Sequence, residues 1–264
     1  MELRKRLAHF LKRWPALYRF VEAVYFALKP VHLMELVVGT KAREKEWATR
    51  HRSKVDDWNN RQHTSENDEW VIGYWDSRNH SHRPFLIQKI SAFYPFCSIL
   101  EIGCNCGPNL YLMAKRFPDL QLIGIDINLR AIERGSELFA SESISNVKLS
   151  VGKADELEQF QDKSFDIVFT DAVLIYVGPD KIRKVIQEML RVARRALILV
   201  ERHCFKPGDP LGRGVYRAGC WERNYVALLK QFVPEERISV TKINSDIWPD
   251  ERWQQTGAII EVVM

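Results

Sequence analysis

The feature that most constrains the fold of this chain is a short apolar run that leads into a glycine-containing turn. Residues 98–103 read Ser-Ile-Leu-Glu-Ile-Gly, and Gly107 follows four residues later. A short, mostly apolar run bounded by a turn is typical of a strand that is buried on both faces. Apolar residues at helical spacing come next and end at Pro118, which predicts a helix. A buried strand followed at once by a helix is the beginning of a β-α-β unit.

The same alternation continues to the C-terminus. Further strands are predicted at 121–127, 147–151, 165–170, 196–200, 238–243 and 258–263, with helices at 129–140 and 180–193. Alternating strands and helices indicate a parallel sheet that is covered on both faces. No helix is predicted between the last two strands, which indicates an antiparallel hairpin. The expected fold class is α/β: a Rossmann-like, doubly wound, mostly parallel sheet of seven strands with an antiparallel C-terminal edge hairpin, plus an N-terminal helical extension.

Charge and composition divide the chain into three predicted parts. Residues 1–54 contain 13 Lys and Arg against 5 Asp and Glu, whereas the other 210 residues contain 26 against 29. We therefore expect residues 1–40 to form a basic amphipathic helical arm, because apolar side chains recur at helical spacing there. Residues 41–84 are polar but rich in Trp, which disordered linkers seldom are, so we expect helices or a lid. Residues 85–264 form the α/β domain.

The basic arm has two interpretations. Basic residues beside an aromatic amphipathic helix suit peripheral contact with an anionic membrane. Most amphipathic helices are simply half-buried, so the alternative is packing on the arm's own domain or on a second subunit of a homo-oligomer. A nucleic-acid partner is disfavoured, because the rest of the chain is not basic. No stretch of 18 apolar residues occurs, and the five cysteines include no C-x-x-C pair, which favours a cytoplasmic protein.

The loop after the first predicted strand is flanked by carboxylates. Ligands of such sheets bind beyond the carboxyl ends of the strands. Gly103 and Gly107 let the backbone turn tightly, and Asn105 tolerates the left-handed conformation. Asp126 ends the second strand, where a carboxylate can bind the two hydroxyls of a ribose. The negative charge of Glu101 would repel a pyrophosphate and attract a cationic ligand.

These segments resemble the class I S-adenosylmethionine-dependent methyltransferases. The resemblance covers about residues 85–264 and is carried by LEIGCNCGPNL (100–110), IGIDIN (123–128), VGKADEL (151–157) and FDIVFTDAVLIYV (165–177). It implies an enzyme that uses S-adenosyl-L-methionine as its cofactor. One position departs from the family pattern, because Asn105 stands where the middle glycine of the loop is usual.

The resemblance also implies which residues bind the cofactor. The loop from Glu101 to Gly107 would hold the methionine part, Asp126 the ribose hydroxyls and Asp155 the adenine amino group, while Asp171 would face the reacting methyl group. The complete set of expected cofactor-binding residues is Glu101, Gly103, Cys104, Asn105, Gly107, Asp126, Ile127, Ala154, Asp155, Glu156 and Asp171. We interpret Cys104 and Cys106 as small loop residues rather than redox centres.

Catalysis of methyl transfer depends on positioning, and a hydroxyl acceptor also needs a general base. His203, just after the fifth strand, is the first candidate because an imidazole titrates near neutral pH. Asp171 is the second candidate, acting alone or orienting a histidine, and Tyr176, His80 and His82 come next. The alternatives are that His203 is an ordinary loop histidine, and that Asp171 caps a helix or contacts only the cofactor.

Two further pairs are candidate substrate contacts. His80 and His82 are two residues apart, but no third ligand lies nearby in the sequence, so we predict no metal site and expect them to contact substrate. The segment 204–221 contains Arg213 and Arg217 and is predicted to be a cationic loop for phosphate or carboxylate groups. The alternative for this segment is a solvated surface loop.

The acceptor is the part of the function that the sequence constrains least. After the fourth strand the chain lacks the Asn/Asp-Pro-Pro-Tyr/Phe motif of enzymes that methylate nucleobases and glutamine. We expect O-methylation of a sugar-containing or phosphorylated acceptor: a small molecule, a glycan or a lipid-linked molecule. The alternatives are N-methylation of a lipid headgroup or small amine and, third, a non-catalytic cofactor-binding subunit.

Overall fold

One seven-stranded sheet organises the molecule. The computed structural model describes residues 40–48, 69–206, 212–217 and 219–264. The strands of the sheet are β1 (Ser98–Ile102), β2 (Gln121–Asp126), β3 (Val147–Val151), β4 (Phe165–Asp171), β5 (Ala193–Arg202), β8 (Ile238–Lys242) and β9 (Gly257–Val263). They lie in the order β3-β2-β1-β4-β5-β9-β8; the first five are parallel, and β9 is antiparallel to both of its neighbours. The predicted seven-stranded α/β fold is confirmed.

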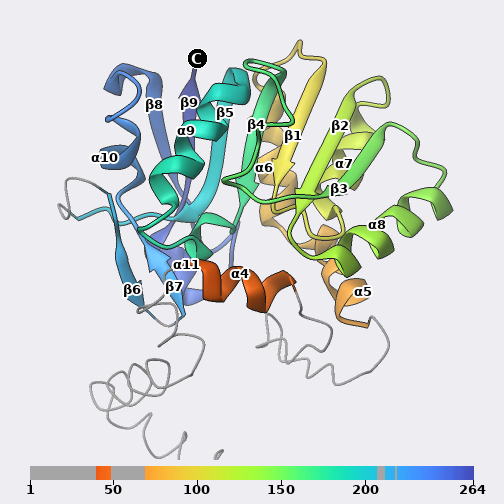
Figure 1. Cartoon of the computed structure of the whole chain (residues 1–264), viewed down its shortest axis with the longest axis horizontal. Helices are drawn as coiled ribbons and strands as arrows, with labels where there is room; N and C mark the ends of the chain where they lie inside the picture. Colours follow the sequence, from red (N-terminus) through yellow and green to blue (C-terminus); the bar gives the residue numbers. More distant parts are fainter. Residues whose placement is uncertain (1–39, 49–68, 207–211, 218) are drawn as a thin grey trace, which may run out of the picture.

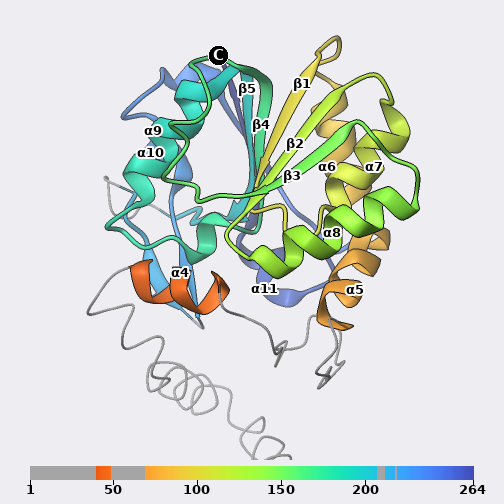
Figure 2. The same cartoon turned by 45° about the vertical axis from the view of Figure 1, so that its right-hand side comes forward.

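Helices cover both faces of the sheet, as Figures 1 and 2 show. They are α4 (Thr40–Ala48), α5 (Glu69–Asp76), α6 (His82–Ser91), α7 (Pro108–Arg116), α8 (Leu129–Ser141), α9 (Ile182–Val192), α10 (Tyr225–Leu229) and α11 (Glu251–Thr256), with short 3-10 helices at Ser77–Asn79, Leu174–Tyr176 and Glu235–Arg237. Figure 2 places α9 and α10 on one side of the strands and α6, α7 and α8 on the other.

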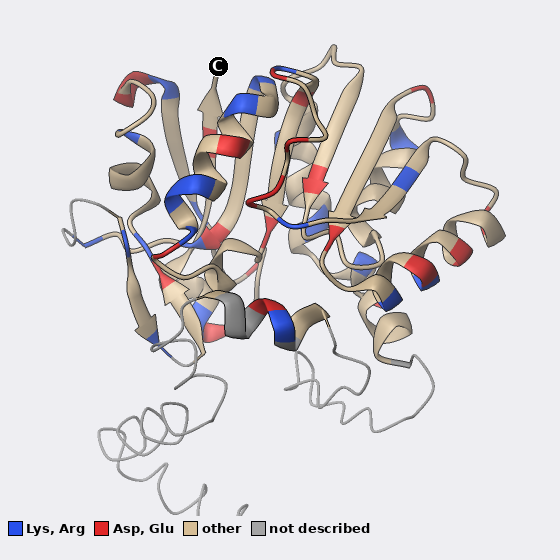
Figure 3. Ribbon diagram, in the orientation of Figure 1, with Lys and Arg blue, Asp and Glu red and all other residues tan. Residues whose placement is uncertain are grey.

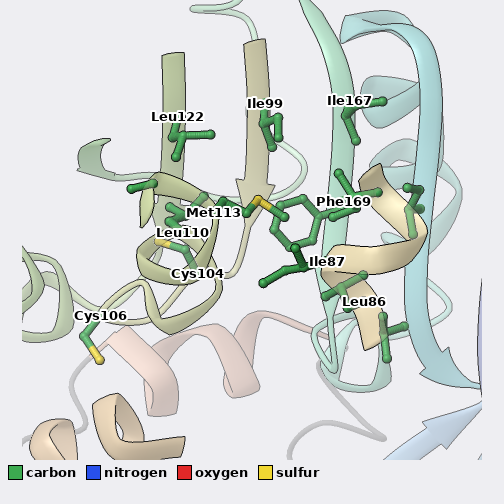
Figure 4. Packing of buried hydrophobic residues seen from close by; sticks show 14 of the residues in the cluster. Leu86, Ile87, Ile99, Cys104, Cys106, Leu110, Met113, Leu122, Ile167 and Phe169 are labelled. Carbon is green, nitrogen blue, oxygen red and sulfur yellow. The ribbon is translucent and has the colours of Figure 1, made fainter. Parts of the chain in front are cut away.

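Two apolar cores lie on the two faces, because successive residues of a strand point in opposite directions. Ile167 and Phe169 of β4 belong to the core under α5–α8, whereas Val168 between them belongs to the core under α9 and α10. Figure 4 shows the first core, in which Phe169 of the sheet lies beside Ile87 of α6 and Met113 of α7. Since the central strands are buried on both faces, they read as continuous apolar runs in the sequence.

The strand order reverses between β1 and β4. The chain moves from β1 outward to β2 and β3, then returns to the other side of β1 for β4 and β5. The loops after β1 and β4 therefore lead away from each other, which leaves a crevice at the carboxyl ends of these two strands. Figure 1 shows α4 lying across this end of the sheet.

The helices that begin at this edge have clear local start signals. Pro108 is the first residue of α7, where its missing N–H costs no hydrogen bond. Asn128 precedes α8 and its side chain accepts a hydrogen bond from the Ala131 N–H at 3.1 Å, as predicted for a cap.

Two details of the C-terminal third differ from the sequence prediction. The last two strands, β8 and β9, pair antiparallel at one edge of the sheet, as expected, but the helix α11 lies between them. The segment predicted as a cationic loop contains an antiparallel hairpin, β6 (Val215–Arg217) and β7 (Cys220–Glu222). Strands of three residues are too short to show a period of two, which is why the sequence pattern did not reveal this hairpin.

The N-terminal predictions are only partly within reach of the structure. The basic arm at 1–40 lies outside the described residues except for Thr40. Of the segment 41–84, the described residues form α4, α5 and the start of α6. No helix in the described ranges combines the length and apolarity needed to cross a membrane.

Candidate functional site

A cavity opens at the carboxyl ends of β1, β2 and β4, beneath α4. Its wall combines apolar side chains with the carboxylates that end the strands, and Figure 3 shows acidic positions at this end of the sheet. The residues that line it from each element include Thr40, Glu44 and Trp47 of α4, Tyr74 of α5, Gly103 and Asn105 after β1, Asp126 and Ile127 after β2, Ala154 and Asp155 after β3, and Asp171, Val173, Tyr176 and Lys181 from the end of β4 onward.

The turn after β1 has the backbone geometry expected of a cradle. Gly103 and Gly107 have φ angles of 74° and 86°, and a Cβ atom on Gly103 would lie 2.3 Å from Cγ2 of Val173. Asn105 has a φ of 52°, so it adopts the predicted left-handed conformation. Its side-chain oxygen accepts a hydrogen bond from the Cys106 N–H at 2.8 Å. Asparagine therefore makes the turn that a glycine makes in the usual family pattern.

Asp126 lies at the end of β2 and stabilises this turn. Its two oxygens accept hydrogen bonds from the backbone N–H groups of Asn105 and Asn128, each at 2.8 Å. Burial raises its pKa, although these hydrogen bonds act in the opposite direction. Each carboxylate oxygen can accept a second hydrogen bond, so the group can still bind a pair of neighbouring hydroxyls.

Lys181 connects the loop after β3 to α4. Its ammonium lies 3.0 Å from Oδ2 of Asp155 and also contacts Glu44. Burial lowers the pKa of Lys181, but the two carboxylates raise it by more, so the lysine is charged. Ala154 lines the cavity beside Asp155, whereas Glu156 is exposed and pairs with Lys153 at 2.9 Å.

The carboxylate of Asp171 has two different oxygens. Oδ2 accepts hydrogen bonds from Nε2 of His82 at 2.9 Å, Nη1 of Arg83 at 3.0 Å and Nδ2 of Asn109 at 3.0 Å. Oδ1 is buried and has no hydrogen-bond partner among the described residues. Because Asp171 lines the cavity, Oδ1 is the oxygen that remains for a ligand.

The charge states of the two neighbouring carboxyl groups differ. Burial alone would raise the pKa of Asp171, but His82 and Arg83 hold it well below its usual value. Burial raises the pKa of Glu101 to about 8, against the effect of a 2.7 Å hydrogen bond from Asn109. Glu101 lies behind the cavity wall, and its Oε2 also lacks a partner within the described part of the chain.

The structure places His80 and His82 behind Asp171 rather than on the cavity wall. His82 is the first residue of α6 and is 2% exposed. Its Nδ1 lies 2.6 Å from Nδ1 of His80, and its ring stacks on Trp248 with centroids 4.0 Å apart. The two rings therefore lie at the beginning of a helix.

His203 does not line the cavity. It is 4% exposed, and its Nδ1 accepts a hydrogen bond from the backbone N–H of Tyr225 at 3.2 Å. Burial lowers its pKa to about 4, because nothing charged compensates the lost hydration. The structure therefore gives this histidine a packing environment and not the position of a base. Tyr176 does line the cavity, with its ring centroid 5.0 Å from that of Trp47.

The remaining predicted residues lie around the cavity rather than on its wall. Arg213 and Arg217 are exposed on and before β6. Cys104 and Cys106 are buried, and burial raises the pKa of both thiols, as packed rather than reactive cysteines require. Gly107 lies at the start of α7 against Phe139.

Sequence reasoning missed the contributions of α4, α5 and α7. Thr40, Glu44 and Trp47 were in a segment predicted only as helical, and Tyr74 carried no motif. Asn109 was inside the quoted segment 100–110, but its position in the family pattern gave it no role. Its amide bridges Glu101 and Asp171, which are 70 residues apart.

The strand order, the glycine turn after β1 and the carboxylates that end β2 and β4 define a class I S-adenosylmethionine-dependent methyltransferase domain. Residues 99–196 match the family model described as "Methyltransferase domain". Residues 99–196 therefore form a methyltransferase domain of the class I S-adenosylmethionine-dependent type. The binding roles of the individual residues stay predictions.

The chain resembles several proteins in sequence over part of its length. The chain is 31% identical over 121 residues to an uncharacterized protein of Rickettsia prowazekii, a match that covers 42% of this chain and 48% of that protein. It is 27% identical over 167 residues to the human tRNA N(3)-cytidine methyltransferase METTL6, which covers 58% and 56% of the two chains. The chain thus spans about half the length of the curated relatives it matches.

Solved structures show the same fold at low identity. The geranyl diphosphate C-methyltransferase of Streptomyces coelicolor aligns with a TM-score of 0.59 and 12% identity, over 89% of this chain and 98% of the other. A SAM-dependent methyltransferase of Aquifex aeolicus aligns with a TM-score of 0.53 and 15% identity, over 75% and 98%. At these identities the likeness concerns the fold.

Proposed function

We propose that this protein transfers the methyl group of S-adenosylmethionine to a hydroxyl oxygen of an acceptor that carries sugar or phosphate groups. The observation that carries the proposal is that the two carboxylate oxygens of Asp171 have different hydrogen bonding. One oxygen is fixed by three donors, and the other, in a residue that lines the cavity, is buried with no hydrogen-bond partner among the described residues. An oriented, ionised oxygen is what a hydroxyl group needs as its hydrogen-bond acceptor.

The residues present fit the cofactor. At Gly103 the backbone runs where a side chain would not fit, and without a side chain a ligand can approach the backbone closely. Asp126 can accept two ribose hydroxyls, and the ionised carboxylate of Asp171 at the end of β4 favours a cationic ligand over an anionic one. When bound, S-adenosylmethionine supplies an electrophilic methyl group on a positively charged sulfur.

Asp171 selects an acceptor atom that carries a hydrogen. Its ionised Oδ1 would attract an O–H or N–H group and would repel a carboxylate at the same place. The acceptor oxygen would take the methyl group that the bound cofactor supplies, leaving a neutral thioether, and would then give its proton to Oδ1 of Asp171 or to water. Because that oxygen is much more acidic than the starting alcohol, a weak base such as Asp171 is sufficient.

The hairpin β6–β7 supports the sugar or phosphate part of the proposal. It packs beside the 3-10 helix Leu174–Tyr176, whose Tyr176 lines the cavity. Buried Arg223 fixes this arrangement by donating to the carbonyl of Leu174 at 2.8 Å. Arg213 just before the hairpin and Arg217 on it are exposed guanidinium groups of the kind that bind phosphate, although Arg217 also lies 3.7 Å from Glu222.

The test is methyl transfer from S-adenosylmethionine with a labelled methyl group to a panel of sugars, nucleotide sugars, glycolipids, aminophospholipids, small amines and tRNA. The proposal expects label on oxygen of a sugar-containing or phosphorylated acceptor. Asp171→Asn should lower kcat by about 100-fold and leave the affinity for S-adenosylhomocysteine nearly unchanged. Asp126→Ala should instead weaken that affinity.

Other outcomes of the panel would replace the acceptor class. Label on an aminophospholipid or small amine would establish N-methylation, and label on tRNA would follow the precedent of the human relative named above. No labelled product from any acceptor, together with no heat of binding for S-adenosylhomocysteine, would contradict the enzyme assignment.

We also propose that the basic arm at 1–40 brings the domain to anionic membranes. The support is its excess of Lys and Arg beside an amphipathic pattern. The full-length protein should sediment with vesicles that contain phosphatidylglycerol, and a chain without residues 1–39 should not. Equal sedimentation of both chains, or of neither, would remove this proposal.

A further inference from the structure

We propose that His82 is a positioning residue for methyl transfer. It fixes the direction in which Asp171 presents Oδ1 to the acceptor, and Trp248 and His80 fix the ring of His82 in turn. This inference rests on the proposed function, because it explains how the carboxylate of that site is oriented.

The contact between the side chains of His82 and Asp171 is direct and buried. Nε2 of His82 lies 2.9 Å from Oδ2 of Asp171, and the side chains are 2% and 4% exposed. An ionised carboxylate only accepts hydrogen bonds, so Nε2 carries the hydrogen. The other ring nitrogen, Nδ1, then has no hydrogen and accepts a hydrogen bond from Nδ1 of His80, at 2.6 Å. Both nitrogens of His82 are therefore used for orientation.

Aromatic stacking holds the plane of the ring. His82 stacks on Trp248 with an angle of 25° between the rings, and Trp248 stacks on Trp253 with centroids 3.8 Å apart and an angle of 9°. The hydroxyl of Ser81 donates to the carbonyl of Ile247 at 2.7 Å, which ties the start of α6 to the same C-terminal segment. The ring cannot turn without breaking these contacts.

The other two residues that donate hydrogen bonds to Asp171, Arg83 and Asn109, also make hydrogen bonds to other residues. Nε and Nη2 of Arg83 bond to the carbonyl and hydroxyl of Ser77, and the amide of Asn109 also bonds to Glu101. Within the described part of the chain, the ring of His82 has Asp171 and His80 as its hydrogen-bond partners, so its replacement acts mainly on the orienting contact.

His82 contributes direction rather than charge. Among the described residues, the titratable groups that interact with Asp171 are Tyr74 of α5, His80 just before α6, His82 and Arg83 of α6, and Glu101 of β1. Burial lowers the pKa of His82, which favours its neutral form, so Arg83 is the cation that balances the carboxylate. A loss of His82 should therefore affect the reaction rate more than the binding of the cofactor.

The test compares two amides at position 82. In His82→Gln the amide nitrogen can reach the place of Nε2, whereas in His82→Asn it reaches only the place of Nδ1. We expect kcat of His82→Gln to stay within about threefold of the wild type, and kcat of His82→Asn to fall by about 30-fold. The KM for the acceptor and the dissociation constant of S-adenosylhomocysteine should change less than threefold in both variants.

A second measurement uses the unaltered protein. Nitrogen-15 NMR of histidine-labelled protein should show His82 as a neutral ring with its hydrogen on Nε2 from pH 6 to 8. The opposite tautomer, a charged ring or equal kcat values of the two amide variants in an active enzyme would overturn the positioning role alone. An inactive wild type would overturn the proposed function, and this inference with it.

Discussion

Glu101 lies near the end of β1 with its carboxyl group almost fully buried, and this burial has a measurable consequence. Its pKa rises from 4.5 to about 8 in the folded protein. The folded state therefore binds a proton between these values that the unfolded state has lost. The stability that this group contributes is complete below pH 4.5 and is lost as the pH rises through about 8, by at most about 1.4 kcal/mol per pH unit.

Glu101→Gln keeps the hydrogen bond from Asn109 and cannot ionise. We expect its free energy of unfolding to increase relative to that of the wild type between pH 5 and 8, and the difference to level off above pH 8. Guanidinium titrations at pH 5.5, 7 and 8.5 measure this difference. Glu201 has a pKa raised by burial to about 7, but it is present in both proteins and cancels. A difference that does not change with pH would contradict the prediction.

Asn105 permits a second prediction about a single residue. Its φ of 52° costs an alanine about 1 kcal/mol more than a glycine. Both Asn105→Gly and Asn105→Ala lose the hydrogen bond to the Cys106 N–H, so their comparison isolates the backbone conformation. Calorimetry with S-adenosylhomocysteine should show the alanine variant binding about fivefold more weakly than the glycine variant. Equal affinities would mean that the turn relaxes without cost.

Among the elements, α4 closes one wall of the cavity through a small number of anchors. The N–H of Thr40 donates to Asp180 at 3.0 Å, and the Thr40 hydroxyl accepts from the Gly178 N–H at 2.6 Å. At the other end, the carbonyl of Trp47 accepts from Asn128 at 2.7 Å. The helix thus spans from the segment after β4 to the segment after β2.

Lys181 is the anchor between these ends, because it pairs with Glu44 of α4 and with Asp155. Lys181→Met should weaken the binding of S-adenosylhomocysteine about fivefold, mainly through faster dissociation, since removal of one tether costs about 1 kcal/mol. Surface plasmon resonance measures both rates. Lys184→Met is the matched control, because this neighbouring lysine is 54% exposed and lies 3.7 Å from Glu158. Equal dissociation rates for the two variants would show that α4 does not retain the ligand.

The elements that the sequence predicted well are those in which apolar residues follow the strand or helix period over at least five residues. The predicted strand at 147–151 coincides with β3, and the helix predicted at 129–140 is α8 at Leu129–Ser141. The hairpin β6–β7 and the six-residue α11 were missed, because strands of three residues and a helix of less than two turns carry no measurable period. Their formation depends on tertiary packing.

At the scale of the whole molecule, the site is assembled from segments far apart in the chain. The part of the cavity wall that we expect to bind the cofactor is formed by the ends of successive strands, so contiguous motifs were sufficient to predict Asp126, Asn105 and Asp171 there. The surroundings of Asp171, where we propose that the acceptor binds, depend on contacts such as His82 with Asp171, 89 residues apart, and Ser81 with Ile247, 166 residues apart. No local pattern encodes such pairs, which is why His203 was preferred to His82 on sequence grounds.

This assembly predicts where a ligand rigidifies the molecule. The cavity is lined by α4 and by the loops that follow β1, β2, β3 and β4. The turns at 117–120, 142–146 and 160–164 precede strands, so they lie at the opposite, amino-terminal ends of the strands. S-adenosylhomocysteine should therefore slow amide hydrogen exchange in the first group and leave these three turns unchanged. Mass spectrometry of peptides measures both groups in one experiment, and Asp126→Ala, with its weakened binding, should show little protection at the same ligand concentration. Protection confined to the opposite edge, or exchange in α4 that the ligand does not alter, would mean that the ligand binds elsewhere than in the cavity beneath α4.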